Sequence, residues 1–162
     1  MNKNLFLLLL ILIGVGTVFF FLPNDEKKIR NHLSTLAEYA SSSPADAPMA
    51  VLKKVSLAAK LCSTPCSIHF ESFNIDRDFD KKALTDHILM MKKMLPDTQF
   101  TFHDTAIDFP ENNRAELLTT LRLKGKINDN RFTDVYEISI HAEKIKSSWF
   151  FSSFRIVEFL QK

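Results

Sequence analysis

Residues 132–160, FTDVYEISIHAEKIKSSWFFSSFRIVEFL, decide the fold of this chain. Apolar and polar side chains alternate along much of this stretch, which is the pattern of a β-strand with one buried face. The residues from Thr98 onward alternate in the same way, and turn residues interrupt the pattern at 110–113, at 125–130 and near Lys146. We therefore predict a long antiparallel meander with strands at about 98–109, 114–125, 132–144 and 148–160.

Helical spacing replaces alternation in the residues before the meander. Apolar side chains recur there every three or four positions, which predicts three amphipathic helices. Pro23 and a cap at Asn24 or Asp25 mark the start of the first helix, and Asp80 is a good cap for the third. The three apolar stripes are Ile29, Leu33, Leu36 and Ala40, then Val51, Val55, Ala58 and Cys62, then Leu84, Ile88, Met91 and Leu95.

One further strand is predicted between the second and third helices. SIHFESF at 67–73 alternates, with Ile68 inward and His69 outward. Pro65 should break the chain before this strand, and NIDRDFD at 74–80 is typical of a turn. The order is then helix, helix, strand, helix and four strands, which predicts an α+β domain built in layers.

An apolar segment precedes this domain, namely Leu5–Leu22, LFLLLLILIGVGTVFFFL. A helix of these 18 uncharged residues is just long enough to cross a bilayer. We therefore expect residues 1–22 to be a single-pass membrane anchor and residues 23–162 to be one domain. A cleaved signal peptide is the alternative, although its only small-x-small triplet, at 14–16, lies inside the apolar run.

Two signals oppose each other on the orientation of the domain. Lys27, Lys28 and Arg30 follow the anchor and favour a cytoplasmic domain by the positive-inside rule. The very short N-terminal tail is typical of a signal anchor that exports the rest of the chain, and the close pair Cys62 and Cys66 suits an oxidising compartment. We favour an extracytoplasmic domain, with the cytoplasmic orientation as the alternative.

The element order and the closing strand WFFSSFRIVEF resemble the NTF2-like (SnoaL-like) superfamily over residues 23–162. The resemblance implies a cone in which three helices pack in a curved, mostly antiparallel sheet, with a pocket at the open end. Members of the superfamily include dehydratases, isomerases, hydrolases and many binding or assembly modules. Some, such as the VirB8-type proteins of type IV secretion, carry the domain behind one transmembrane helix, and this chain is similar to them in layout.

Composition excludes several classes of site. Lys and Arg number 21 against 19 Asp and Glu, so the chain lacks the basic excess of a nucleic-acid-binding protein. Gly125 is the only glycine after the anchor, which argues against glycine-rich phosphate loops. His69, His103 and His141 lie on predicted strands without metal-ligand spacing. We predict no metal site and no cofactor.

A carboxylate at the pocket edge is the candidate catalytic residue. Strict alternation places Asp104 on the same face as Phe100 and Phe102, where partial burial would raise its pKa toward that of a general base. NTF2-like enzymes often have an acidic residue or a histidine in such a position. The alternative is that a bulge turns Asp104 to solvent. Tyr39 and Tyr136 complete the predicted pocket lining.

Cys62 and Cys66 enclose the short sequence CSTPC. This spacing differs from that of thioredoxin-type redox motifs, so we predict a structural disulfide at the corner between helix and strand. Two reduced, half-buried thiols are the alternative.

The last strand carries apolar residues on both faces. Under strict alternation Trp149, Phe151 and Val157 share one face, while Phe150 and Phe154 lie on the other. One face fills the cone, so the other needs a cover. We predict that Trp149, Phe151 and Val157 form a surface for a homodimer or for a protein partner in the cell envelope. A local loop or the bilayer surface is the alternative cover.

Two functions fit these observations. The first is a membrane-held binding or assembly module, because no acid–base constellation stands out. The second is a small-molecule enzyme of the SnoaL, dehydratase or isomerase type that uses Asp104 in the cone. A cavity lined by Asp104 and another polar group favours the enzyme, and a cone closed by phenylalanines favours the binding module.

Overall fold

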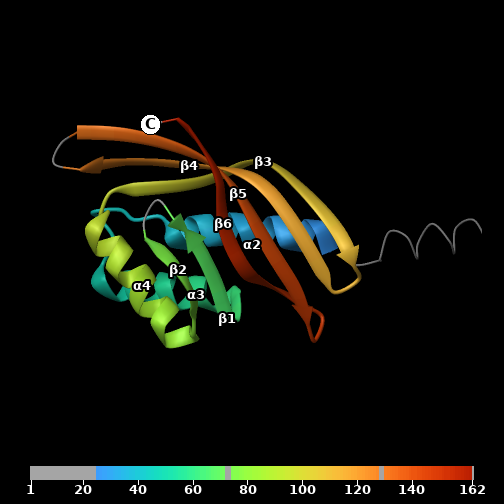
Figure 1. Ribbon diagram of the computed structural model, residues 1–162. Coiled ribbons are helices and arrows are strands. Elements are labelled where there is room, and N and C mark those ends of the chain that lie inside the picture. The colour runs from blue at the N-terminus through green and yellow to red at the C-terminus, as the bar shows by residue number, and fades with distance from the viewer. Residues whose placement is uncertain (1–24, 72–73, 128–129, 162) are drawn as a thin grey trace, which may run out of the picture.

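The computed structural model describes residues 25–71, 74–127 and 130–161 (Figure 1). The predicted anchor, Leu5–Leu22, lies outside the described residues, and no helix within them has the length and apolar character that crossing a membrane requires. The described helices and strands are α2 (Asp25–Ala40), α3 (Pro48–Lys60), β1 (Cys62–Phe70), β2 (Ile75–Phe79), α4 (Lys81–Met94), β3 (Thr98–Glu111), β4 (Arg114–Ile127), β5 (Asn130–Ile145) and β6 (Ser148–Gln161).

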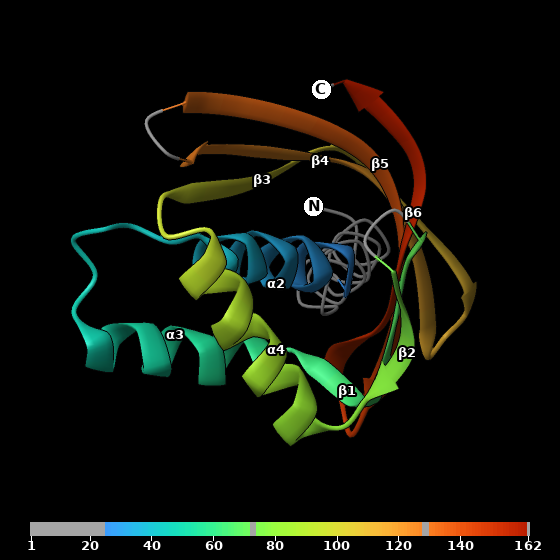
Figure 2. The same ribbon diagram turned by 60° about the vertical axis from the view of Figure 1, so that its left-hand side comes forward.

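The strands form one curved sheet in the order β2-β1-β6-β5-β4-β3. All neighbouring pairs are antiparallel except β1 and β6, which run parallel. The three helices lie on the concave side of this sheet, with α2 closest to the meander (Figures 1 and 2). The predicted α+β cone, its three helices and its four-strand meander are confirmed.

Local sequence explains where the helices begin. The Asp80 side chain accepts a hydrogen bond from the Ala83 amide at 2.7 Å, which caps α4 as predicted. Pro48 occupies the first turn of α3, where its missing N–H costs nothing. Asp25 at the start of α2 pairs with Lys144 of β5 at 2.7 Å, and His32 of the same helix contacts the Trp149 carbonyl at 3.1 Å. These contacts attach α2 to β5 and β6.

Two local predictions around β1 were wrong. Residues 75–79 form the edge strand β2 instead of a turn, because Asp76 and Asp78 find partners across the strand pair in His69 and Ser67, each at 2.5 Å. Pro65 does not end the chain's extended run, since β1 spans Cys62–Phe70. An irregularity in the pairing of β1 with β6 between Cys62 and Ser67 accommodates the proline instead.

Strand β6 keeps one apolar face by means of three extra residues. His141 and Ala142 of β5 are adjacent, yet their partners on β6 are Ser153 and Phe151, so one residue bulges between them. The same two-for-one pairing leaves extra residues at Val157 and Leu160. Each bulge reverses the alternation. Trp149, Phe151, Phe154 and Ile156 therefore all face the helices and belong to the core or pack against it.

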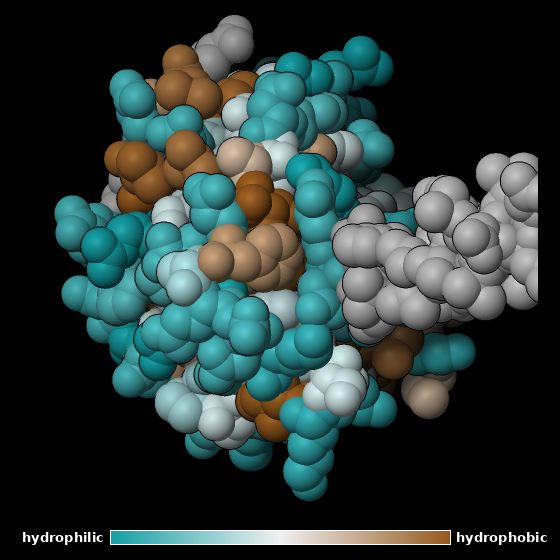
Figure 3. Space-filling view, turned by 90° about the vertical axis from the view of Figure 1, so that its right-hand side faces the viewer, coloured by the Kyte–Doolittle hydropathy of each residue, from teal (hydrophilic) through white to brown (hydrophobic). Residues whose placement is uncertain are grey.

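The predicted partner surface is therefore wrong at two of its three residues. Trp149 and Phe151 are each only 2% exposed and belong to the core, because the bulges removed the supposed surplus of apolar faces. Val157 is 53% exposed, because it is itself a bulged residue. On the face in Figure 3 apolar residues form separate patches between hydrophilic ones. Whether the domain pairs with a copy of itself or with an envelope protein stays a prediction.

Replacing Trp149 by Ser together with Phe151 by Thr should abolish cooperative unfolding. Each loss of a large buried aromatic side chain costs about 3–5 kcal/mol, and a whole domain holds only about 5–15 kcal/mol. Urea denaturation followed by circular dichroism measures this. The control is Val157→Ser on the same strand, which should change the unfolding free energy by less than about 0.5 kcal/mol. If the double variant instead folds and associates with itself more weakly, the predicted partner surface on this strand would be supported.

Gly125 leaves room for an aromatic ring where β4 meets β5. A Cβ atom at this position would lie 2.6 Å from the Phe132 ring and 2.8 Å from the backbone oxygen of Asp97. We expect Gly125→Ala to destabilise the domain by roughly 1–3 kcal/mol, since the backbone oxygen cannot swing away as a side chain can. Thermal unfolding measures the loss. Lys124→Ala, at the exposed neighbouring position, serves as the control and should be close to neutral.

Candidate functional site

Two hollows border helix α2. The first is an apolar cavity of about 150 Å³ between α2, α4 and the concave face of the sheet. The second is a groove of about 680 Å³ between α2 and β3, lined largely by polar side chains. Ala37, Ser42, Phe100 and Phe102 border both, so the cavity adjoins the groove. An apolar molecule in the cavity could therefore keep a polar end near water.

The cavity walls are almost entirely apolar. Its polar side chains are Ser42 and Lys92, and no carboxylate or imidazole of a described residue lines it. The apolar lining comes from α2, α3 and α4 and from five strands. It consists of Leu36, Ala37, Ala40, Ala58, Cys62, Ile68, Phe70, Leu84, Ile88, Met91, Leu95, Phe100, Phe102, Leu121, Ile138 and Phe154.

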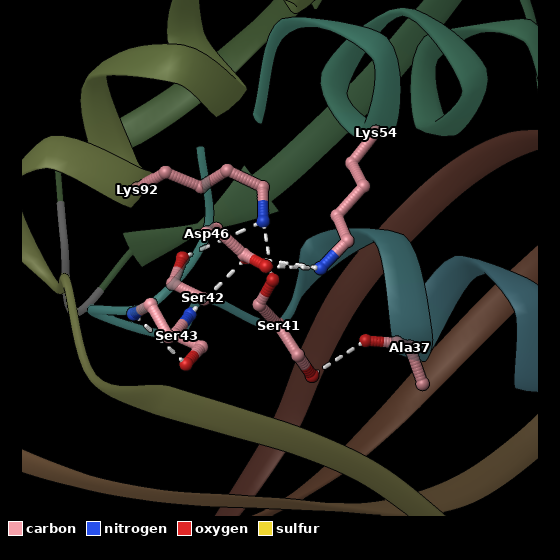
Figure 4. A network of polar contacts seen from close by, with 8 residues as sticks. Ala37, Ser41, Ser42, Ser43, Asp46, Lys54 and Lys92 are labelled. Atoms are coloured by element: carbon pink, nitrogen blue, oxygen red, sulfur yellow. Dashed lines mark hydrogen bonds and ion pairs between the residues drawn. The ribbon is translucent and has the colours of Figure 1, made fainter. Parts of the chain in front are cut away.

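Lys92 is the charged group of this cavity. Its side chain leaves α4 and is only 6% exposed, and its ammonium donates to the Ser41 carbonyl and lies 3.5 Å from the Ser42 hydroxyl. Lys54 approaches the same loop from α3 and pairs with Asp46 at 2.9 Å (Figure 4). Two ammonium groups thus converge on the loop of residues 41–46, which follows α2.

The electrostatic setting disfavours the charge on Lys92. Burial lowers its pKa below the ordinary lysine value, and the nearby Lys54 lowers it further, while Asp46 acts weakly in the opposite direction. The carboxylate of Asp46 already accepts two hydrogen bonds from Lys54, at 2.9 and 3.0 Å. That pairing lowers the pKa of Asp46. Lys54 therefore pairs with the described carboxylate whose charge acts on Lys92.

Asp104, the predicted catalytic carboxylate, lies outside both hollows. His103 pairs with Thr120 and Ala106 with Leu118, so β3 carries one extra residue at this point. Asp104 adopts a left-handed φ of 49° there and is exposed. Asp tolerates this conformation better than most residues. The bulge considered as the alternative is present, and the prediction that Asp104 sits at the pocket edge was wrong.

The other predicted pocket residues divide into two groups. Phe100 and Phe102 line the cavity as predicted. Tyr136 instead packs in the core against Phe159 and donates a hydrogen bond to Asp134 at 3.3 Å, with its pKa raised to about 12 mainly by burial. Tyr39 is half-buried and lines none of the hollows described above.

Cys62 and Cys66 are free thiols in the structure, and both are buried. The predicted disulfide is therefore absent, and the alternative of two reduced thiols describes the site. Both cysteines lie within β1, where Cys62 donates to the Ala58 carbonyl at 3.8 Å. Contact with Cys66 and burial raise the pKa of Cys62, which keeps its thiol protonated.

The three strand histidines have different surroundings. His69 contacts Asp76 and His103 contacts Thr101 at 3.1 Å, while His141 is exposed on β5. Within the described ranges no group of three or more His, Cys, Asp and Glu side chains has the arrangement of a metal site.

Sequence reasoning missed Lys92, because a lysine in the last turn of a helix usually points to solvent and complements the helix dipole. The stripe Leu84, Ile88, Met91 and Leu95 occupies positions i, i+4, i+7 and i+11, and Lys92 occupies i+8 of the same face. A lysine at that position of an apolar stripe was the available signal that its ammonium would be buried.

The curved sheet, the enclosed helices and the hollow beside α2 define the NTF2-like (SnoaL-like) α+β cone fold, also described as cystatin-like. Solved structures of this fold match over most of the chain. The Kfla4162 protein from Kribbella flavida has a TM-score of 0.71 at 16% identity, covering 85% of this chain and 93% of that one. A cystatin-like protein from Nostoc punctiforme has a TM-score of 0.65 at 12% identity, covering 83% and 91%.

An enzyme is also among these structural neighbours. The hexachlorocyclohexane dehydrochlorinase LinA-type3 from Novosphingobium barchaimii LL02 has a TM-score of 0.67 at 10% identity, covering 85% of this chain and 90% of that one. Identities this low show a shared fold alone. The sequence itself matches no protein-family model and no curated protein.

Proposed function

We propose that the domain is a binding module that takes up a small, largely apolar molecule in the cavity beside α2. The observation that supports this function is the lining, in which apolar side chains surround about 150 Å³ and only Ser42 and Lys92 are polar. Dry apolar cavities of about this volume take up a single-ring hydrocarbon. Larger ligands need pockets of roughly 300–1,000 Å³.

The absence of an acid–base pair favours binding over catalysis. General acid–base chemistry needs a proton donor and acceptor within reach of the bound molecule. Asp104 is exposed on the bulge of β3, and no carboxylate or imidazole of a described residue lines the cavity. Among the described residues, the cavity therefore lacks the carboxylate that the enzyme hypothesis requires.

An elimination enzyme is the second candidate function, and Lys92 is the observation that favours it. Its pKa is lowered by burial, so its amine is more often unprotonated, and able to accept a proton, than that of an exposed lysine. A structural neighbour is named as a dehydrochlorinase, which removes hydrogen chloride from its substrate. Release of chloride from hexachlorocyclohexane, with its loss in Lys92→Met, would support this function.

Attachment to a membrane is part of the proposal. It rests on the sequence of Leu5–Leu22, whose 18 residues carry no charge. We further propose that the domain lies on the extracytoplasmic side of the membrane, which the protease digestion described below tests. Such a module would offer its cavity to small molecules close to the bilayer surface.

The cavity proposal predicts that toluene binds to the purified full chain. Ala40→Leu should fill part of the cavity and weaken binding at least about ten-fold, because a side chain then occupies the volume of the ring. Nuclear magnetic resonance titration of the full chain in amphipol, with amphipol alone as the blank, measures the affinity. Ala83→Leu makes the same change at an exposed position of α4 and should leave binding unchanged. Absence of toluene binding to the unaltered chain would refute the proposal.

The anchor proposal predicts that the full chain sediments with membranes and resists extraction by alkaline carbonate. A protein beginning at Asn24 should remain in the soluble fraction, because it lacks the apolar segment. Protease digestion of sealed vesicles, with and without detergent, tests the orientation. Recovery of a mature chain beginning near Thr17 would contradict the anchor and support a cleaved signal peptide.

A further inference from the structure

Lys92 is a buried cation without a matching anion. Only 6% of its surface is exposed, and no described carboxylate pairs with its ammonium. Its contacts are a carbonyl and a hydroxyl, from Ser41 and Ser42, which are uncharged. Burying a charge is costly unless an opposite charge balances it. Lys92 therefore either loses its proton or pairs with an anion that the chain itself does not provide.

No described carboxylate is free to supply that anion, and the apolar cavity lies beside Lys92. Asp46 is held by Lys54 through two hydrogen bonds, so it does not turn to Lys92. The ammonium has three donors, of which the Ser41 carbonyl and the Ser42 hydroxyl use two. Lys92 and Ser42 both line the apolar cavity, and Ser42 also borders the groove. No described group takes the third donor, and Ser42, which contacts the ammonium, lies where the cavity meets the groove.

We propose that the ligand of the cavity is a small amphipathic carboxylate, whose apolar ring or short chain fills the cavity and whose carboxylate pairs with Lys92 and the Ser42 hydroxyl. This inference rests on the proposed binding function and specifies its ligand class. A carboxylate supplies two acceptor oxygens, which suits one ammonium and one hydroxyl. The lowered pKa of Lys92 agrees with this reading, since it describes the site before an anion arrives.

The charges around the site are consistent with an anion. Lys54 contributes a second positive charge from α3, and Arg30 of α2 lines the adjoining groove. Two carboxylates, those of Asp46 and Glu38, carry negative charge near these cations. Asp46 is paired with Lys54, and Glu38 lines the groove rather than the cavity. A cationic or neutral ligand would leave the charge on Lys92 unbalanced.

Titration of the full chain in amphipol with three single-ring probes tests the ligand class. Phenylacetate should bind about ten-fold more tightly than toluene or benzyl alcohol, the size expected of one charge-assisted hydrogen bond. Lys92→Met should remove this preference, so that phenylacetate binds no more tightly than toluene, and Lys92→Arg should keep most of it. Lys93→Met, at the exposed neighbouring position on α4, is the matched control and should leave the preference intact.

A second measurement uses the unaltered chain, so that the proposal can be tested even if the Lys92→Met variant fails to fold. Phenylacetate should stabilise the protonated amine, so binding at about pH 9 should take up protons, whereas toluene binding should not. Calorimetric heats in buffers of different ionisation enthalpy give the number of protons. Equal affinity for the three probes, with no proton uptake, overturns the carboxylate but leaves the binding module standing. If none of the three probes binds, the binding function itself fails.

Discussion

Strand β6 must bend around the helices and still keep its apolar side chains on one face. A regular strand cannot do both, because strict alternation would turn Phe154 and Ile156 away from the helices once Trp149 and Phe151 face them. The extra residue at Ser152 reverses the alternation and increases the local bend. Phe154 then lines the cavity together with Ile138 of β5. The wall of the binding site therefore depends on an irregularity in the strand beside it.

The regular parts of this fold could be predicted from sequence, and the irregular parts could not. The alternation of the meander strands and the helical spacing of α2 are patterns of neighbouring residues, so they can be recognised in the sequence alone. A bulge depends on how two strands pair across space, and nothing in SSFRIV marks Ser152 as an extra residue. The same limit explains the misplaced β2. Its aspartates look like turn residues until His69 and Ser67 stand opposite them.

The candidate site shows the same division. Phe100 and Phe102 precede the bulge of β3 and were placed correctly, whereas Asp104 lies at the bulge and was not. Lys92 could have been found, because its position continues the apolar stripe of α4. The groups around Lys92 could not have been predicted, because the Ser41 carbonyl and the Asp46–Lys54 pair come from segments that only the fold brings together. The sequence therefore predicts the apolar residues that line a cavity more readily than the surroundings of a charged residue beside it.

The attachment of α2 to the sheet also determines how the domain responds to mechanical tension. Asp25 begins the first described helix and is fixed to Lys144 of β5 at 2.7 Å, while His32, two turns on, contacts the backbone carbonyl of Trp149. Any pull on the chain ahead of Asp25 therefore reaches the sheet within the first turns of α2. The force is shared by these contacts before it reaches the residues of α2 that line the cavity, Leu36, Ala37 and Ala40. Tension applied at this end would therefore load the contacts of α2 with β5 and β6 before it reached the cavity.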